Sequence, residues 1–249
     1  MSSLKLNMNL IIDIGNTRVK AAVFEENNVV DLILFDKNRI LSEIKKILKK
    51  YSITEAIMSS VAKIPEIEKV KIQKLIKLHE LSYRTLVPFL NLYKTPKTLG
   101  VDRIALVTNA VTTFPNQNVL VIDAGSCITF DFVNSKKEYL GGAISPGINM
   151  RFNSLNKYTA NLPLLEKKLL KDFTGKNTKE SMNSGVVNGV IQEIEGVIYQ
   201  YKKKYLVLTV VLTGGDTNFL SKQLKSSIFA NQNFLLEGLN EVLIFNKNQ

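Results

Sequence analysis

One short pattern occurs twice in this sequence, about one domain apart, and it limits the possible folds strongly. Residues 10–17 read LIIDIGNT and residues 120–127 read LVIDAGSC. In each copy an apolar run typical of a buried strand ends at Asp, and Gly follows two residues later. A second apolar stretch then begins, Val19 to Phe24 in the first copy and Ile128 to Val133 in the second. The sequence therefore predicts the same strand–loop–strand unit twice, which indicates an internal duplication.

The two loops have the composition of phosphate-binding loops. Glycine lets backbone N–H groups approach phosphate oxygens closely, Thr17 and Ser126 offer hydroxyl donors, and Lys20 offers a positive charge. Asp13 and Asp123 would repel phosphate, so they are better suited to hold a cation or water next to it. A single Asp-x-Gly could simply cap a turn. Two matched copies favour a nucleotide site.

A third glycine loop and several missing motifs narrow the kind of nucleotide site. Thr213-Gly214-Gly215-Asp216 follows the predicted strand Leu206 to Leu212. The P-loop spacing fails around Gly175-Lys176, because position 170 is Leu and position 177 is Asn. No G-x-G-x-x-G and no protein-kinase motif occurs.

The segment from Tyr93 to Arg103 ends with an acidic and a basic residue at a predicted helix start. Asp102 would be stabilised there by the helix dipole whatever else it does, so a purely structural role stays open. The functional alternative is a base that orients a substrate hydroxyl, with Arg103 nearby to bind an anion.

Apolar periodicity outlines the other elements. The patterns predict helices near residues 40–48, 65–78 and 102–113, with His79 on an exposed helix end. The segment 114–118 breaks the pattern and indicates a domain boundary, giving domains 1–115 and 116–249. The second half reads as a helix after Pro146, a long helix over 178–201 that begins at an Asn177 cap, and a closing helix over 235–245.

The net charge, the lengths of the apolar stretches and the single cysteine limit the classes of function that the chain could have. The formal net charge is +11, but the basic residues are spread over both halves with no interleaved aromatic motif, so no nucleic-acid partner is expected. No apolar stretch approaches the ~18 residues that span a bilayer, and residues 1–9 lack the apolar core of a secretion signal. Cys127 is the single cysteine, which excludes an intramolecular disulfide and fits a reducing compartment, so we expect a cytoplasmic protein without a membrane partner.

Taken together, these motifs resemble those of type III pantothenate kinase, in the superfamily of acetate and sugar kinases, Hsp70 and actin. The resemblance covers nearly the whole chain and five motifs in order. They are Asp13 to Thr17, Leu99 to Arg103, Asp123 to Asp131, Gly141 to Gly147, and Asn177-Thr178 with Ser184-Gly185.

The resemblance implies an α/β fold of two duplicated RNase H-like, actin-like ATPase domains with a central cleft. Domain 1–115 would carry the first phosphate loop and the substrate motif, and domain 116–249 the second phosphate loop and the adenosine-side Gly-Gly loop. It implies ATP-dependent phosphorylation of the 4′-hydroxyl of pantothenate, the first step of coenzyme A biosynthesis.

The resemblance also implies roles for individual residues. Asp102 would be the catalytic base, and Asp123 would bind a monovalent cation, K⁺ or NH₄⁺, in addition to Mg²⁺ on ATP. Thr178 would be contributed across a homodimer interface. The residues implied to bind ATP are Asp13, Ile14, Gly15, Asn16, Thr17, Arg18, Val19, Lys20 and Ser126, and those implied to bind pantothenate are Tyr93, Gly100, Val101, Asp102, Arg103 and Thr178.

Two positions depart from the family pattern, and two other functions stay open. Ser126 stands where the second motif usually has Thr, and Ala22 stands where the first often ends in Gly. Neither change removes a hydrogen-bond donor. The alternatives are a kinase for another small hydroxyl substrate and a non-catalytic regulatory protein on the same fold.

Overall fold

The chain forms two compact units. The computed structural model describes residues 8–15, 18–60 and 65–247. Unit 1 comprises Met1–Pro115 together with Asn233–Gln249, and unit 2 comprises Asn116–Gln232. Each unit is described below by itself.

Unit 1 is built on a five-stranded mixed sheet of order β3-β2-β1-β4-β5. The strands are β1 (Met8–Ile14), β2 (Val19–Glu25), β3 (Asn28–Phe35), β4 (Ile53–Ser60) and β5 (Lys77–Glu80). The first three form an antiparallel meander, and β4 and β5 extend the sheet parallel to β1. Since β1 is central and its residues 9–14 are buried, its apolar run lies between helices on both faces.

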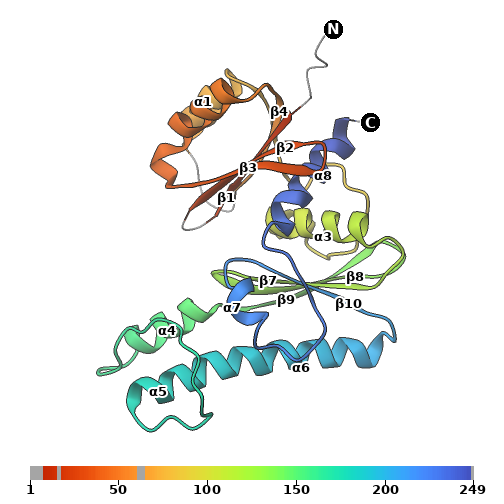
Figure 1. The fold of residues 1–249 in the computed structure, drawn as a ribbon. Helices are drawn as coiled ribbons and strands as arrows, with labels where there is room; N and C mark the ends of the chain where they lie inside the picture. Colours follow the sequence, from red (N-terminus) through yellow and green to blue (C-terminus); the bar gives the residue numbers. More distant parts are fainter. Residues whose placement is uncertain (1–7, 16–17, 61–64, 248–249) are drawn as a thin grey trace. The chain divides into compact units, whose positions relative to one another are not determined.

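Helices cover the two faces of this sheet. The amphipathic helix α1 (Ile40–Lys50) packs its apolar side onto one face, together with α2 (Glu66–Gln73). The helices α3 (Val101–Thr113) and α8 (Phe234–Lys247) lie side by side on the other face (Figure 1). Short pieces complete the unit: the strand β6 (Leu90–Asn91) and 3₁₀ turns at Lys37–Arg39 and Pro96–Thr98.

The closing helix differs from the expected domain boundaries, because α8 belongs to unit 1 rather than to the second half of the chain. Its position is fixed by close contacts with α3 and β1. Gly238 lies so near α3 that a Cβ there would be 2.1 Å from the carbonyl oxygen of Ala105. Buried Asn9 on β1 donates to the side chain of Asn240 at 2.8 Å. The chain therefore returns to unit 1 after completing unit 2.

Unit 2 repeats the sheet of unit 1. In chain order its strands are β7 (Val119–Ala124), β8 (Cys127–Val133), β9 (Glu138–Pro146), β10 (Thr209–Thr213) and β11 (Phe229–Ala230). They lie in the order β11-β10-β7-β8-β9, with an antiparallel β7-β8-β9 meander and with β10 and β11 parallel to β7. Both units thus share one strand order and one set of strand directions, which confirms the predicted α/β fold class.

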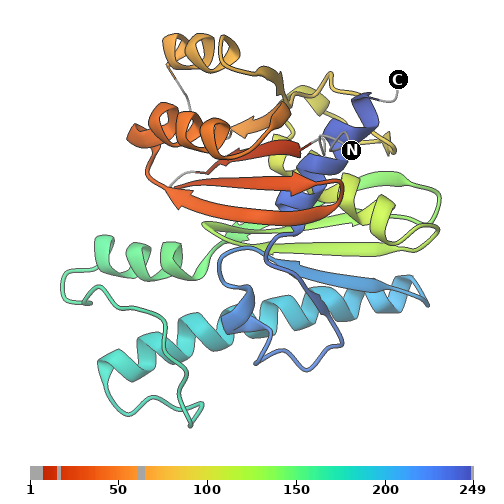
Figure 2. The same ribbon diagram turned by 45° about the horizontal axis from the view of Figure 1, so that its top comes forward.

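The core of unit 2 lies between this sheet and a long helix. The helix α6 (Gly189–Lys204) runs along one face of the sheet (Figure 2) and buries Val190, Ile194 and Ile198 against it. It continues a shorter helix, α5 (Thr178–Asn183), through one π-helical turn at Ser184–Asn188. The helices α4 (Ile148–Lys157) and α7 (Thr217–Leu220) complete the unit.

The environment of His79 differs from the sequence expectation. The predicted helix over 65–78 ends at Gln73, and His79 lies on strand β5, which pairs parallel with β4. Its Nε2 lies 2.7 Å from a carboxylate oxygen of Glu55 on β4. This histidine is therefore a half-buried sheet residue rather than an exposed helix end.

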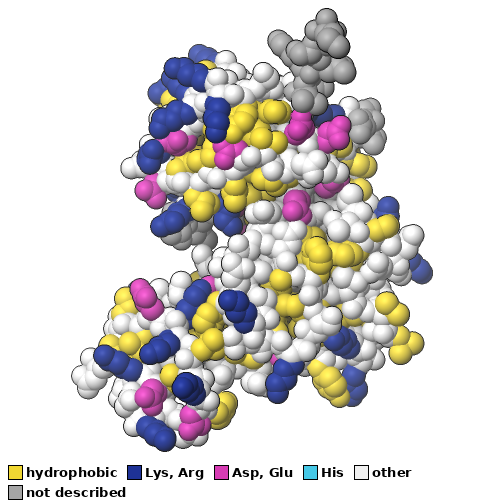
Figure 3. Space-filling view, viewed as in Figure 1, with side chains coloured by type: hydrophobic (Ala, Val, Ile, Leu, Met, Phe, Trp, Pro, Cys, Tyr) yellow, Lys and Arg dark blue, Asp and Glu magenta, His cyan; other side chains and the backbone are white. Residues whose placement is uncertain are grey.

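Charged side chains are dispersed over the face of the molecule that Figure 3 shows. In the view of Figure 3, Lys and Arg side chains occur on both units and alternate with acidic and uncharged groups. No helix among the described residues is both long and apolar enough to cross a membrane.

Candidate active site

The first predicted phosphate-binding loop follows β1, which ends at Ile14. Asp13 is 8% exposed and its Oδ1 accepts a hydrogen bond of 2.8 Å from the hydroxyl of Ser59 on the neighbouring strand β4. The N–H of Gly15 donates to the carbonyl of Arg18 at 3.1 Å and closes the turn. Asn16 and Thr17, both predicted to bind ATP, lie outside the described residues.

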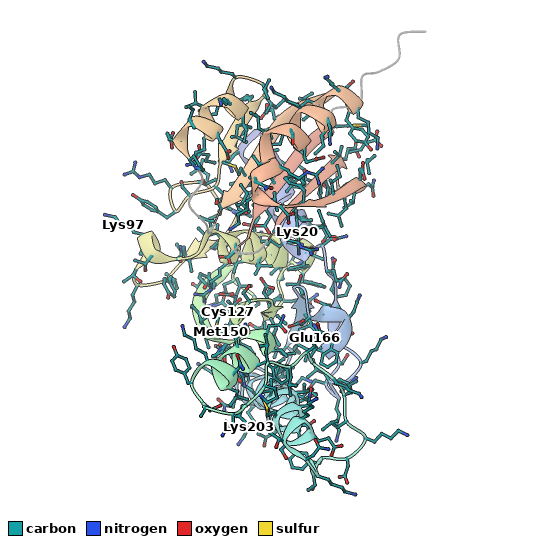
Figure 4. All side chains as sticks on the ribbon, turned by 90° about the vertical axis from the view of Figure 1, so that its left-hand side faces the viewer. Lys20, Lys97, Cys127, Met150, Glu166 and Lys203 are labelled. Carbon is teal, nitrogen blue, oxygen red and sulfur yellow. The ribbon has the colours of Figure 1, made fainter. Side chains whose placement is uncertain are left out.

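The other residues of this loop that are predicted to bind ATP differ in the burial of their side chains. Ile14 and Val19 are buried in the core of unit 1, so only their backbone groups could meet a nucleotide. Arg18 is exposed. Lys20 is half-buried on β2 in register with Asp13 (Figure 4), and its positive charge lowers the pKa of that carboxyl. Lys20 is thus the basic side chain held beside the first aspartate.

The substrate motif forms the beginning of α3. Gly100 is the N-cap residue, and Val101 and Asp102 open the helix. The carboxylate of Asp102 folds back over the helix end, where its Oδ1 accepts from the N–H of Arg103 at 2.9 Å. A Cβ on Gly100 would lie 2.4 Å from that same Oδ1, so glycine leaves the space that the carboxylate occupies.

Tyr93 and Arg103 come together beside this helix end. Arg103 is 5% exposed, and its guanidinium carbon lies 5.6 Å from the centre of the Tyr93 ring. The aromatic face stabilises a cation at this distance. Because Arg103 directly follows Asp102, one helix turn presents a carboxylate and a guanidinium together.

Electrostatics link the first loop with the substrate motif, both in unit 1. Burial raises the pKa of Asp102, and the hydrogen bond and charge of Arg103 oppose that rise. Burial also raises the pKa of Asp13, Ser59 and Lys20 lower it, and the negative charge of Asp102 adds to the rise. The two carboxyl groups therefore interact electrostatically, and neither has the environment of an ordinary surface aspartate.

The second loop joins β7 to β8 in unit 2. The N–H of Gly125 donates to the carbonyl of Cys127 at 2.9 Å, and the N–H of Gly147 donates to the carbonyl of Ser126 at 3.1 Å. Ser126 is exposed, and the half-buried Cys127 begins β8 (Figure 4). Asp123 is half-buried and lies one residue before the end of β7, as Asp13 lies one residue before the end of β1.

The Gly-Gly loop after β10 is packed directly against the second loop. Gly214 has φ +95°, and a Cβ there would lie 2.3 Å from Oδ1 of Asp123 and 2.4 Å from the carbonyl oxygen of Ala124. The N–H of Asp216 donates to that same carbonyl at 2.9 Å. The ends of β7 and β10 are therefore held together at Asp123.

Thr178, the remaining predicted substrate residue, is exposed at the start of α5 in unit 2. The side chain of Asn177 caps this helix by accepting from the N–H of Glu180 at 3.0 Å, as the sequence predicts. Thr178 borders a cavity of about 670 Å³ between α4 and α5. The residues lining that cavity include Arg151, Leu155, Met182, Gly185 and Val186.

Sequence reasoning missed Ser59, which holds Asp13 but belongs to no motif. Asp131, the last residue of the second motif, is fully buried and accepts from the Tyr139 hydroxyl at 2.6 Å and the Thr129 hydroxyl at 3.1 Å. In the described chain, no group of three His, Cys, Asp or Glu side chains could hold a metal ion. A cation here would therefore need hydroxyl, carbonyl or phosphate oxygens as well.

Comparison with known proteins decides among the kinase families. Residues 9–200 match the type III pantothenate kinase family. A type III pantothenate kinase of Christiangramia forsetii is 48% identical over 97% of this chain and 100% of its own length. The chain belongs to the type III pantothenate kinase family.

Solved structures show the same fold at lower sequence identity. A Baf-family protein of Campylobacter jejuni, named provisionally as a transcriptional activator, is 23% identical and superimposes with a TM-score of 0.64 over 96% of this chain and all of that one. A Listeria monocytogenes protein, named provisionally as an N-acetylmannosamine kinase, is 12% identical with a TM-score of 0.55 over 97% of this chain and all of that one. At these identities, the similarity between this chain and the two solved structures shows a shared fold and nothing more.

Proposed function

We propose that this protein transfers the γ-phosphoryl group of ATP to the 4′-hydroxyl of pantothenate, giving 4′-phosphopantothenate and ADP in the first step of coenzyme A biosynthesis. Family membership supports the substrate. The observation that carries the chemistry is the pair of interacting carboxyl groups in unit 1, Asp13 after the first loop and Asp102 at the start of α3.

Asp102 is the proposed base. As the hydroxyl oxygen forms its bond to the γ-phosphorus, the bond from that phosphorus to the β–γ bridging oxygen breaks and ADP leaves. The hydroxyl proton passes to the carboxylate of Asp102. Partial burial keeps this carboxyl away from bulk water and raises its pKa, while the Arg103 N–H fixes one oxygen. The second oxygen can therefore face a substrate hydroxyl.

Arg103 and Tyr93 are proposed to bind the pantothenate carboxylate. A guanidinium is suited to a carboxylate because its planar N–H groups can make two parallel hydrogen bonds. The Tyr93 ring lies beside the Arg103 guanidinium and stabilises its positive charge.

ATP is proposed to bind through the glycine loops, with Lys20 and Ser126 as side-chain donors. Mg²⁺ accompanies ATP and neutralises charge on its phosphates. Asp13 suits such an ion or its water ligands, because Ser59 holds one carboxylate oxygen in a buried position. Asp123 is proposed to hold the monovalent cation. The packing of Gly214 against its Oδ1 fits an oxygen site at that strand end.

The active form is proposed to be a homodimer in which Thr178 serves the site of the partner protomer. Mixing two inactive variants tests this. In a heterodimer of Asp102→Asn and Thr178→Ala chains, one of the two sites has both wild-type residues. We expect an equal mixture to recover roughly a quarter of wild-type turnover for a two-fold symmetric dimer. No recovery after subunit exchange would show that Thr178 acts within its own protomer or not at all.

A cytoplasmic location is also proposed. The single Cys127 is half-buried and without a second cysteine to pair with, which fits a reducing compartment.

A substrate panel tests the proposed reaction. The purified protein would be incubated with ATP and Mg²⁺, with or without K⁺, and ADP release followed with pantothenate, pantetheine or simple sugars as acceptor. We expect ADP release with pantothenate that increases with K⁺. Release with another acceptor alone would favour a different small-molecule kinase, and no release with any acceptor would favour the non-catalytic alternative.

A further inference from the structure

A buried acidic residue directly follows the Gly-Gly loop of unit 2. Asp216 comes after Gly214 and Gly215 and is 8% exposed. Gly215 itself is exposed, and a Cβ built there would meet no atom within 4 Å, so the loop borders open space. The N–H of Asp216 donates to the carbonyl of Ala124, where the second loop begins, at 2.9 Å. Asp216 therefore lies beside both of the unit 2 loops that are proposed to bind ATP.

The carboxylates at this end of the sheet oppose the binding of an anion. Asp123 is close to the Gly-Gly loop, since a Cβ on Gly214 would lie 2.3 Å from its Oδ1. The fully buried Asp131, bonded to the Tyr139 hydroxyl, is a further acidic side chain on the neighbouring strand β8. A triphosphate carries several negative charges, and carboxylates repel it unless positive charge compensates them. Asp216 adds to this repulsion wherever its own charge is not neutralised.

Lys167 places a positive charge directly on Asp216. Its Nζ forms an ion pair with Oδ1 of Asp216, in which the lysine side chain is 29% exposed and the aspartate side chain 11%. The same Nζ lies 5.3 Å from the centre of the Phe219 ring on α7. The side chain of Asp216 makes no capping hydrogen bond to that helix. A pair shielded in this way keeps more of its electrostatic energy than an ion pair in open water.

The backbone that carries Lys167 is held in place. Residues 158–176 form no helix or strand, so the pair is a tertiary contact between distant parts of the chain. The N–H of Lys168 donates at 2.8 Å to Oδ1 of Asn183 on α5, and Leu165 packs against the core of unit 2. An anchored backbone leaves less conformational entropy to lose when the side chain forms its ion pair. The position of Lys167 beside Asp216 is therefore built into the fold of unit 2.

We propose that Lys167 neutralises Asp216 and thereby allows the Gly-Gly loop to accept an anionic nucleotide. Lys167 is a positioning residue, because it acts through Asp216 and is not itself a ligand of the nucleotide. The assignment rests on the proposed function, in which the Gly-Gly loop belongs to the ATP site. It gives a role in nucleotide binding to residues 158–176, which belong to none of the five motifs.

The affinity for ADP tests this role without measuring turnover. Calorimetric titration with ADP and Mg²⁺ would be done in about 0.1 M KCl, and again with the ionic strength raised to about 1 M by choline chloride. We expect Lys167→Met to raise the Kd roughly 10-fold at the lower ionic strength and by less at the higher one. Lys167→Arg keeps the charge and should stay close to the wild type. Lys69→Met is the matched control, because Lys69 is 23% exposed and pairs with Glu80 in unit 1.

Replacing the partner separates charge neutralisation from a structural clamp. Asp216→Asn removes the carboxylate and leaves Lys167 in place, so we expect it to bind ADP at least as tightly as the wild type. The double variant Lys167→Met/Asp216→Asn leaves neither charge and should recover most of the affinity that Lys167→Met loses. A clamp would behave differently, because either single substitution would break it and weaken binding equally.

Three results would overturn the assignment. They are equal losses of ADP affinity in Lys167→Met, Asp216→Asn and the double variant, a lower melting temperature of Lys167→Met with an unchanged Kd, and a wild type that binds no ADP. The double variant keeps the test valid if Lys167→Met fails to fold, because it leaves no buried charge without its partner. The expected pattern of ADP affinities in a protein that fails to phosphorylate pantothenate would sustain the role of Lys167 and refute only the proposed function.

Discussion

At the residue scale, the position of the Asp102 carboxylate depends on its neighbour Gly100. The carboxylate occupies space that any larger residue at position 100 would take. The backbone N–H of Arg103 donates to it at 2.9 Å and helps to hold it there. Catalysis by a positioned base is sensitive to shifts of this kind, because the base must reach one proton of a bound substrate.

Replacing Gly100 with Ala should displace the base without unfolding the protein. The clash is with the end of a side chain rather than with backbone, and the φ of Gly100, −58°, is accessible to alanine. We expect kcat to fall by roughly 100-fold and the melting temperature to stay near the wild-type value. Gly196→Ala is the control, since a Cβ there meets no atom within 4 Å. Wild-type kcat in Gly100→Ala would show that the observed Asp102 position is unimportant.

The ionised carboxylate of Asp13 should lower the free energy of unfolding at neutral pH. Burial raises its pKa, so the ionised form favours the unfolded chain, and this penalty disappears as pH falls and the carboxyl protonates. We expect Asp13→Asn to have a higher melting temperature than the wild type at neutral pH, by about 2–4 °C for each kcal/mol of unfolding free energy gained. This difference should shrink towards acid pH. Asp36→Asn, which removes an exposed carboxylate, is the control. A difference that grows on acidification would contradict the assigned direction.

At the element scale, the packing of α8 into unit 1 depends on a buried amide pair. Asn240 is 1% exposed, accepts from Asn9 and donates to the carbonyl of Glu26 at 2.8 Å. These bonds join the last helix to the first strand and to the β2–β3 turn.

Asn240→Ala should therefore destabilise the fold through its loss of hydrogen-bond partners. It leaves the Asn9 amide and the Glu26 carbonyl unsatisfied, at a cost of about 1–3 kcal/mol. Urea unfolding followed by circular dichroism would measure this. Asn246→Ala removes hydrogen bonds from the more exposed end of the same helix and should change stability by less than about 0.5 kcal/mol. Equal effects of the two substitutions would argue against a special role for the buried pair.

Local patterns predicted most of the elements but not where each one packs. The strand–loop–strand units, α1 and α8 follow directly from apolar periodicity. The helical pattern over 65–78 misled at its end, where Lys77 to Glu80 pairs as β5 with a strand more than twenty residues earlier. The placement of α8 in unit 1 depends on contacts between residues such as Asn9 and Asn240, which are far apart in sequence.

The residues of the candidate site also differ in whether the sequence alone identifies them. Motif residues such as Asp13, Asp102 and Asp123 are recognisable because the chemistry of phosphate transfer restricts their type and spacing. Ser59 carries no local signal. It becomes relevant only through strand register, which places it beside Asp13. Tertiary pairing therefore supplies the residues that support the motifs.

At the scale of the whole molecule, the chain contains one sheet topology twice with different functional residues on each copy. Unit 1 carries the first predicted phosphate loop together with the whole predicted substrate motif, and unit 2 carries the second predicted phosphate loop and the Gly-Gly loop. The proposed proton acceptor, Asp102 in the first turn of α3, therefore belongs to unit 1.

Turnover of the Asp102→Asn variant tests this account most directly. ADP release would be measured with ATP, Mg²⁺, K⁺ and pantothenate for the wild type and the variant, with nucleotide binding and melting temperature measured in parallel. We expect the variant to bind nucleotide and melt at or above the wild-type temperature, since an uncharged amide replaces a carboxyl with a raised pKa. Its kcat should fall by about 10²–10⁴-fold. Pantothenate-dependent ADP release at a near wild-type rate would contradict the assignment of Asp102 as the base.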